Sequence, residues 1–160
     1  MTNESGLAEA WRVNATITQR LLEAIPAEGL EASYTKRTRT VRAQFQHMHY
    51  VRVQNLEKRG GGTPEDVPVF AKGAEPGKDE LLTALEASGE ALADLMGTFE
   101  RAGEVKSWGG RPPATYLGYF VSHESHHRGL AIVALRFAGI KLPSSTLMGE
   151  LWYSWRKAQD

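Results

Sequence analysis

Five histidines stand out in the sequence because they occupy two short windows that are far apart in the chain. The first window holds His47 and His49, and the second holds His123, His126 and His127. In a helix, residues four positions apart stand one turn apart on the same face, as would His123 and His127. Two neutral imidazoles at that spacing can both reach one divalent ion. The second window therefore predicts two ligands of a metal site, and two buried histidines satisfied by hydrogen bonds are the alternative.

A catalytic zinc-type site needs a third protein ligand and an open coordination position. The first window can supply this ligand, but helical phase does not choose cleanly between its two histidines. The apolar stripe around them centres near His49, whereas His47 sits on the flank of the stripe beside Val51. Helical phase alone slightly favours His49 as the third ligand. For either residue the alternative is a polar side chain at the surface of a half-buried helix.

The second window also fits the H-E-x-x-H pattern of metallopeptidases, in which the glutamate is the general base. Here it reads His123-Glu124-Ser125-His126-His127. However, Glu124 would lie roughly 100° around the helix from His123. No strand-rich segment is available to hold an extended peptide, so a peptidase is the weaker hypothesis.

The elements that must position these residues are helices. Apolar residues recur at helical spacing in four long stretches, with Pro26, Gly60, Gly103 and Gly139 at their ends. The stretches cover about 7–25, 40–59, 79–103 with Asp79 as the N-cap, and 114–138. Asn14 and Thr18 interrupt the first apolar stripe. A shorter helix is predicted over 146–156, and the stretches 60–78 and 104–113 are rich in Gly and Pro and read as loops.

No convincing strand pattern exists, since Val67-Pro68-Val69-Phe70 is short and contains a proline. The fold class predicted is therefore all-α: an antiparallel four-helix bundle with a short C-terminal fifth helix, forming one domain over residues 1–160. On the fourth helix, the stripe facing the core should carry both predicted ligands. Its members are Tyr116, Phe120, His123, His127, Leu130, Ala131 and Ala134.

Composition narrows the function classes. Nineteen Lys and Arg balance nineteen Asp and Glu, so the formal net charge is zero and a dedicated nucleic-acid binder is not expected. The chain has no cysteine, which excludes a cysteine nucleophile and cysteine-ligated metals. No stretch is long and apolar enough to span a membrane, and the polar, acidic start does not resemble a signal peptide. A cytoplasmic protein is the expectation.

At these residues the chain resembles the DinB-like superfamily, which includes YfiT-type metal-dependent hydrolases and thiol transferases. The likeness is carried by Thr40-Val41-Arg42 leading into His47 and Tyr50-Val51-Arg52. It is also carried by the segment from His123 through Gly129, followed by Leu135-Arg136-Phe137-Ala138-Gly139. It extends over most of the chain, including the helix order and the loop between the second and third helices.

The resemblance implies an antiparallel four-helix bundle, often dimeric, that binds zinc or nickel through three histidines. Alignment from the Thr-Val-Arg lead places the first ligand on His47, overriding the weak phase preference, with His123 and His127 as the pair. The implied activity is hydrolysis with a metal-bound water or transfer of a small-molecule thiol. Because the chain has no cysteine, such a thiol must arrive as a cosubstrate. No thiol-binding pocket can be matched residue by residue.

Other residues near the motif are candidates for supporting roles. Glu124, His126 and Tyr116 could orient a ligand or transfer a proton, although solvated or packing roles are equally compatible with their positions. Arg52 and Arg128 could pair with an anionic substrate or with glutamates across the bundle, and the structural pairing is favoured. Trp152 and Trp155 are expected to make packing or dimer contacts.

Overall fold

Four long helices make up most of the computed structural model, which describes residues 5–156. They are α1 (Gly6–Ala24), α2 (Val41–Arg59), α3 (Lys78–Ala102) and α4 (Pro113–Phe137). Their bounds agree with the predicted stretches to within a few residues, and the all-α prediction is confirmed. Within residues 5–156, extended pairing is limited to one isolated bridge between Val105 and Arg111.

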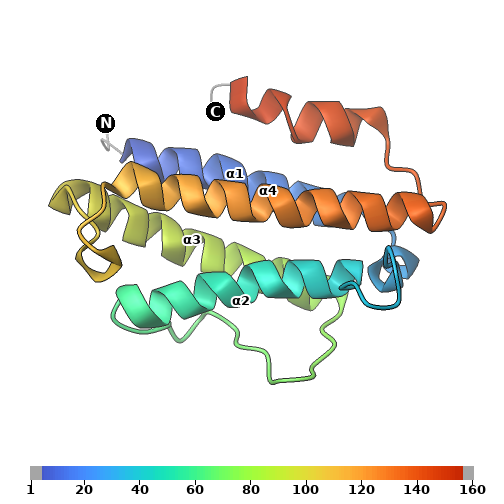
Figure 1. The fold of residues 1–160 in the computed structure, drawn as a ribbon, viewed down its shortest axis with the longest axis horizontal. Coiled ribbons are helices and arrows are strands. Elements are labelled where there is room, and N and C mark those ends of the chain that lie inside the picture. Colours follow the sequence, from blue (N-terminus) through green and yellow to red (C-terminus); the bar gives the residue numbers. More distant parts are fainter. Residues whose placement is uncertain (1–4, 157–160) are drawn as a thin grey trace.

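The helices form a bundle in which α1 and α4 run one way and α2 and α3 run the other (Figure 1). Both α1 and α2 pack against α3 and α4, so α1 and α2 occupy opposite corners. Because α2 and α3 run in the same direction, the chain must cross back along the bundle between them. The Gly- and Pro-rich loop over residues 60–77 makes that long connection, as bundles of this topology require.

The helix ends are capped by local interactions, although one predicted cap residue differs from the observed one. Thr40 caps α2 by accepting a hydrogen bond from the Ala43 N–H at 3.2 Å, and Gly103 ends α3 with φ of 76°. The predicted N-cap Asp79 is wrong, because α3 already begins at Lys78 with Gly77 as the cap residue. Glu80 supplies the capping carboxylate instead and accepts from the Gly77 N–H at 2.8 Å.

The C-terminal segment differs from the single fifth helix expected over 146–156. It forms a π-helical turn, η3 (Ser145–Glu150), and a 3₁₀ turn, η4 (Tyr153–Arg156). Both turns pack against α1 (Figure 1). Two other short 3₁₀ turns, η1 (Ala27–Glu31) and η2 (Lys106–Trp108), lie in the connections.

The bundle core consists of two hydrophobic clusters separated by a buried polar layer. One cluster surrounds Trp11 and Phe120, and the other surrounds Phe45 and Leu135. The predicted stripe of α4 is buried at most positions, but Leu130 is 38% exposed and lies outside the core. The polar layer between the clusters holds the residues that we call the buried polar network: Asn14, Thr18, Arg52, Glu124 and Arg128.

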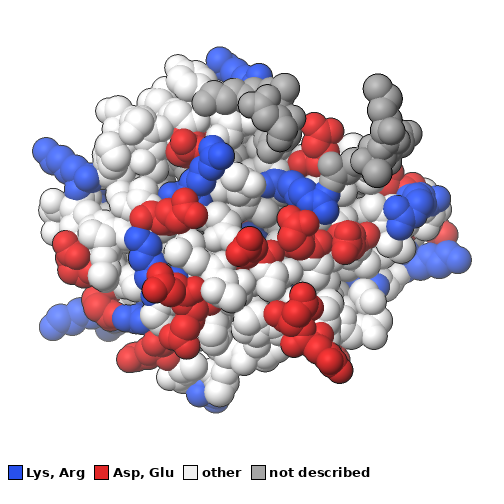
Figure 2. Space-filling view, turned by 180° about the vertical axis from the view of Figure 1, so that it is seen from behind, with Lys and Arg blue, Asp and Glu red and all other residues white. Residues whose placement is uncertain are grey.

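The surface carries charges of both signs. Figure 2 shows the face opposite to that of Figure 1, with acidic and basic side chains both spread among uncharged ones. Over the described part of the chain, no helix combines the length and the apolar character needed to cross a membrane.

Candidate metal centre

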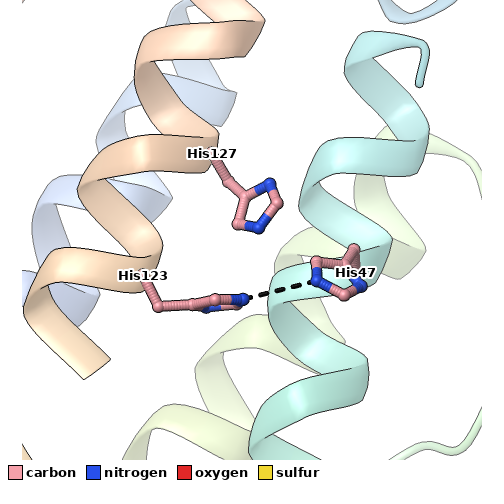
Figure 3. Close-up of side chains that lie close together, drawn as sticks. All are labelled: His47, His123 and His127. Atoms are coloured by element: carbon pink, nitrogen blue, oxygen red, sulfur yellow. Dashed lines mark hydrogen bonds between the residues drawn. The ribbon is translucent and has the colours of Figure 1, made fainter. Parts of the chain in front are cut away.

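Three histidines from two helices converge where α2 and α4 pack against each other. We call His47, His123 and His127 the histidine cluster. Their imidazole rings point toward one another (Figure 3), and one ring nitrogen of each lies within 4.8 Å of the other two. The antiparallel packing of α2 on α4 makes this possible, because it sets position 47 opposite the turn that spans 123–127.

The donor set fits a divalent metal ion. His47 Nε2 and His123 Nε2 are 3.3 Å apart. Nitrogens bound to one tetrahedral zinc ion at about 2.0–2.1 Å would lie roughly 3.3–3.4 Å from one another. Among the described residues, His123 Nδ1 is one of only two buried side-chain polar atoms without a hydrogen-bond partner. The unpartnered Nδ1 is not the nitrogen of His123 that faces His47, which is Nε2. The metal-ligand interpretation therefore rests on the close approach of the three imidazoles, which lets them serve as ligands of one ion.

Gln44 orients one member of the cluster. Its Oε1 lies 2.7 Å from His127 Nδ1, so that nitrogen carries the proton and donates to the amide oxygen. The tautomer leaves His127 Nε2 with a free lone pair, as a metal ligand requires. Gln44 is buried and precedes His47 by three positions on α2, which places both on the side facing α4.

The electrostatic surroundings keep the cluster neutral. Burial, with the positive charge of Arg39 and the neighbouring His123, lowers the pKa of His47 to about 4. Burial and the other histidines, His123 first, lower the pKa of His127 to about 4. The pKa of His123 is also lowered, chiefly by burial. At neutral pH all three rings are therefore uncharged, and each has one protonated nitrogen and one nitrogen with a lone pair that can bind an ion.

Comparison with known proteins identifies the family of the chain. The sequence profile of the DinB family matches residues 1–158. The chain belongs to the DinB family. No curated protein matches it. Family membership and the histidine cluster are together compatible with metal binding.

In this DinB-family chain His49 lies outside the cluster, contrary to the slight preference from helical phase, and the cluster contains His47, the residue that the resemblance selected. Its Nδ1 lies 3.0 Å from Ser88 Oγ on α3, and its Nε2 lies 2.7 Å from the backbone oxygen of Pro68. Phase correctly places His49 on the buried face of α2, where its hydrogen bond to the Pro68 oxygen holds the crossover loop. The side of α2 that faces the histidines of α4 lies on the flank of that buried face, and His47 is on that side.

Glu124 points into the bundle core and belongs to the buried polar network. Its Oε1 accepts from Arg52 Nε at 2.7 Å. Its Oε2 accepts from Asn14 Nδ2 at 2.8 Å, from Thr18 Oγ1 at 2.9 Å and from Arg52 Nη2 at 3.0 Å. Although burial by itself raises the pKa of Glu124, the charges of Arg52 and Arg128 reverse this, and the net pKa is lowered. A carboxylate held this way is a poor general base, which disfavours the H-E-x-x-H peptidase.

The two arginines complete this network and pair structurally, as the sequence favoured. Arg52 also donates from Nη1 to the Leu85 oxygen at 2.7 Å and lies over the Trp11 ring. Arg128 donates to Asn14 and Thr18 at 3.0 and 2.8 Å. Thus the polar residues that interrupt the stripe of α1 are partners of α4.

The other two residues predicted to support the site, Tyr116 and His126, have different surroundings. Tyr116 donates its hydroxyl to Asn55 Oδ1 at 3.0 Å, and burial raises its pKa. His126 is exposed, with its ring centroid 5.1 Å from that of His127. Sequence reasoning missed Gln44, and it also missed Tyr119, whose ring stacks on His123 at 5.9 Å. Both could have been found from helical spacing, since they precede a ligand candidate by three and four positions.

Proposed function

We propose that this protein binds one divalent metal ion through His47, His123 and His127, and that it uses the ion to transfer a small-molecule thiol or to hydrolyse a small substrate. The observation that carries the proposal is the convergence of three neutral imidazoles from α2 and α4. Zinc and nickel suit imidazole ligands, and both are proposed for this site.

Three histidines leave at least one coordination position free for a reactant. A metal ion bound there would lower the pKa of a water molecule toward ~7 or hold a thiolate ready to attack. The chain has no cysteine, so the sulfur nucleophile of a transferase would be a cosubstrate. Gln44 keeps the proton of His127 on Nδ1, and Tyr119 covers one side of His123.

Among the proton-transfer candidates, we place His126 in that role. Its imidazole is exposed next to His127, whereas the polar atoms of Glu124 and Tyr116 are bound elsewhere. An imidazole ring has one nitrogen that can donate a proton and one that can accept it. Replacement of His126 by Asn should therefore reduce turnover while the metal content stays at the wild-type value.

Metal content is the first test. The purified protein, dialysed against zinc or nickel, should hold about one ion per chain by elemental analysis. His123→Ala and His127→Ala should each remove most of the bound metal, because two imidazoles alone bind weakly. His126→Ala is the matched control from the same motif and should retain the ion. Equal metal content in all variants would overturn the metal site.

Activity is the second test. With 1-chloro-2,4-dinitrobenzene and a panel of small thiols, the thiolate sulfur forms a bond to the ring carbon and chloride leaves. Conjugation that rises with metal loading and disappears in His123→Ala supports the transferase, and a parallel panel of small esters and amides tests the hydrolase. Metal binding without either activity would favour the alternative function, a non-catalytic metal or ligand sensor.

Two further properties are part of the proposal. Large apolar side chains are exposed, among them Phe137 at 67% and Trp152 at 64%, and they support self-association as a homodimer. Light scattering coupled to size-exclusion chromatography measures the mass directly. We also propose that the protein works in the cytoplasm on small molecules rather than on nucleic acid, in line with its zero formal charge.

A further inference from the structure

The loop between η1 and α2 carries a cluster of basic residues close to the histidine cluster. Lys36, Arg37 and Arg39 fall within four positions, with no acidic residue among them. The Ala32 oxygen accepts from the Val41 N–H at 2.8 Å and closes the base of the loop. This hydrogen bond joins the two ends of the loop, so the basic residues lie on a short loop whose ends are held together.

Local hydrogen bonds hold the tip in one shape. Thr38 Oγ1 accepts from the Thr35 N–H at 2.9 Å, and Thr35 Oγ1 accepts from the Arg37 N–H at 3.2 Å. Tyr34 is attached to the end of α4 by an edge-on contact with Phe137, with ring centroids 4.5 Å apart. A basic loop fixed in this way can present its guanidinium groups without a large cost in loop entropy.

An open cavity of about 590 Å³ lies between this loop and α4. Its volume is in the range of small-molecule sites. One wall is basic, with Arg37 and Arg39, and the other is apolar, with Leu130 and Val133 from α4 and Tyr34 from the loop. Across residues 5–156, neither guanidinium pairs with a carboxylate. The cavity thus offers unpaired cations beside a surface suited to a hydrocarbon body.

The cavity adjoins the histidine cluster. Gln44 lines it and also holds the His127 ring at 2.7 Å, so the cavity and the cluster are separated by one side chain. Arg39 is close enough for its charge to act on all three histidines of the cluster. A molecule anchored in the cavity would be held next to any ion bound by the cluster.

We propose that this cavity binds the carboxylate of an organic substrate or cosubstrate through Arg37 and Arg39, while the apolar wall holds the adjoining hydrocarbon. This inference rests on the proposed function, because it assigns a substrate class to the same site. Guanidinium groups recognise carboxylates with paired, charge-assisted hydrogen bonds. Inorganic anions lack the hydrocarbon part that the apolar wall would cover.

The test is a binding comparison on metal-free protein, which makes it independent of the metal proposal. The probes are 3-phenylpropionate and 3-phenylpropanol, which share a hydrocarbon body and differ in the carboxylate. Wild type should prefer the acid by about tenfold or more, as expected for hydrogen bonds to a charged group. In R37Q/R39Q the preference should fall to within about twofold, with affinity for the alcohol unchanged.

R111Q/R136Q is the matched control, since it removes two exposed arginines that do not line the cavity. It should keep the wild-type preference. An unchanged preference in R37Q/R39Q, or an equal loss in the control, would overturn the inference. Circular dichroism verifies that each variant is folded.

A second measurement tests the link to the histidine cluster. In Co²⁺-loaded protein, the proton resonances of bound 3-phenylpropionate should broaden strongly relative to the Zn²⁺-loaded form. Binding that requires Arg37 and Arg39 but shows no such broadening would overturn the assignment of the cavity to this centre. Failure to take up Co²⁺ or Zn²⁺ would contradict the proposed function, while the metal-free comparison still decides whether the cavity binds carboxylates.

Discussion

His123 and Glu124 are adjacent in the sequence, yet they belong to two polar regions of opposite character. Glu124 lies in the buried polar network, where each carboxylate oxygen accepts hydrogen bonds and the carboxylate is ion-paired with two arginines. His123 lies in the histidine cluster, which is neutral and partly exposed, and in which one nitrogen of each ring lies within 4.8 Å of the other two. A polar group with all its partners supplied by the protein contributes to structure, whereas three imidazole nitrogens that converge on one point indicate a ligand site.

The largest effect should come from breaking the buried polar network. Glu124→Ala leaves Arg52 and Arg128 buried without their counter-charge, and we expect it to lower the free energy of unfolding by about 3–5 kcal/mol. Urea denaturation followed by circular dichroism measures this. The matched control is Glu90→Ala, which breaks the surface ion pair with Arg12 and should cost about 0–1 kcal/mol. Similar losses in the two variants would contradict the comparison.

A moderate effect, on metal affinity rather than on folding, should come from Gln44. Gln44→Ala removes the acceptor of His127 Nδ1–H and should weaken metal binding by about 10–100-fold. Competition with a zinc indicator measures the dissociation constant. Gln46→Ala serves as the control, because Gln46 donates to the Ala74 oxygen in the crossover loop and not to a cluster histidine. If both variants bind metal as the wild type does, Gln44 has no role in orienting the ligand.

The smallest effect should be a difference in pH dependence, because the histidine cluster and the buried polar network contribute to the stability of the protein over different pH ranges. The pKa values of His47 and His127 are lowered from 6.5 to about 4, so between these values protons bind the unfolded chain and not the folded one. The stability of the metal-free protein should therefore fall as the pH decreases from 6.5 toward 4. The pKa of Glu124 is lowered from 4.5, and its contribution is present above pH 4.5 and lost below it.

Urea titrations at a series of pH values test this separation. In His47→Gln/His127→Gln the decline between pH 6.5 and 4.5 should be shallower, while the loss below pH 4.5 should remain. A decline of unchanged steepness in this variant would show that other groups cause it.

Much of the fold could be predicted from the sequence, because helical periodicity and helix-ending Pro and Gly are local signals. The partners of polar core residues could not be predicted in the same way. Asn14 and Thr18 stood out as interruptions in an apolar stripe, but their contacts with Glu124 connect positions more than one hundred residues apart. The choice between His47 and His49 depended on the direction of α4 from α2, which periodicity does not contain.

The sequence by itself determined that the chain is helical, that its histidines fall into two windows, and that His123 and His127 share one face of a helix. The resemblance to the DinB-like superfamily selected His47 as the third member, which helical spacing could not do. Only the tertiary structure decided that Glu124 faces the core and that Gln44 and Arg39 lie beside the site. The physical reason is that the spacing of residues along a helix determines only the directions in which their side chains point around the axis of that helix. Convergence on a common point depends on how α2 and α4 are packed against each other.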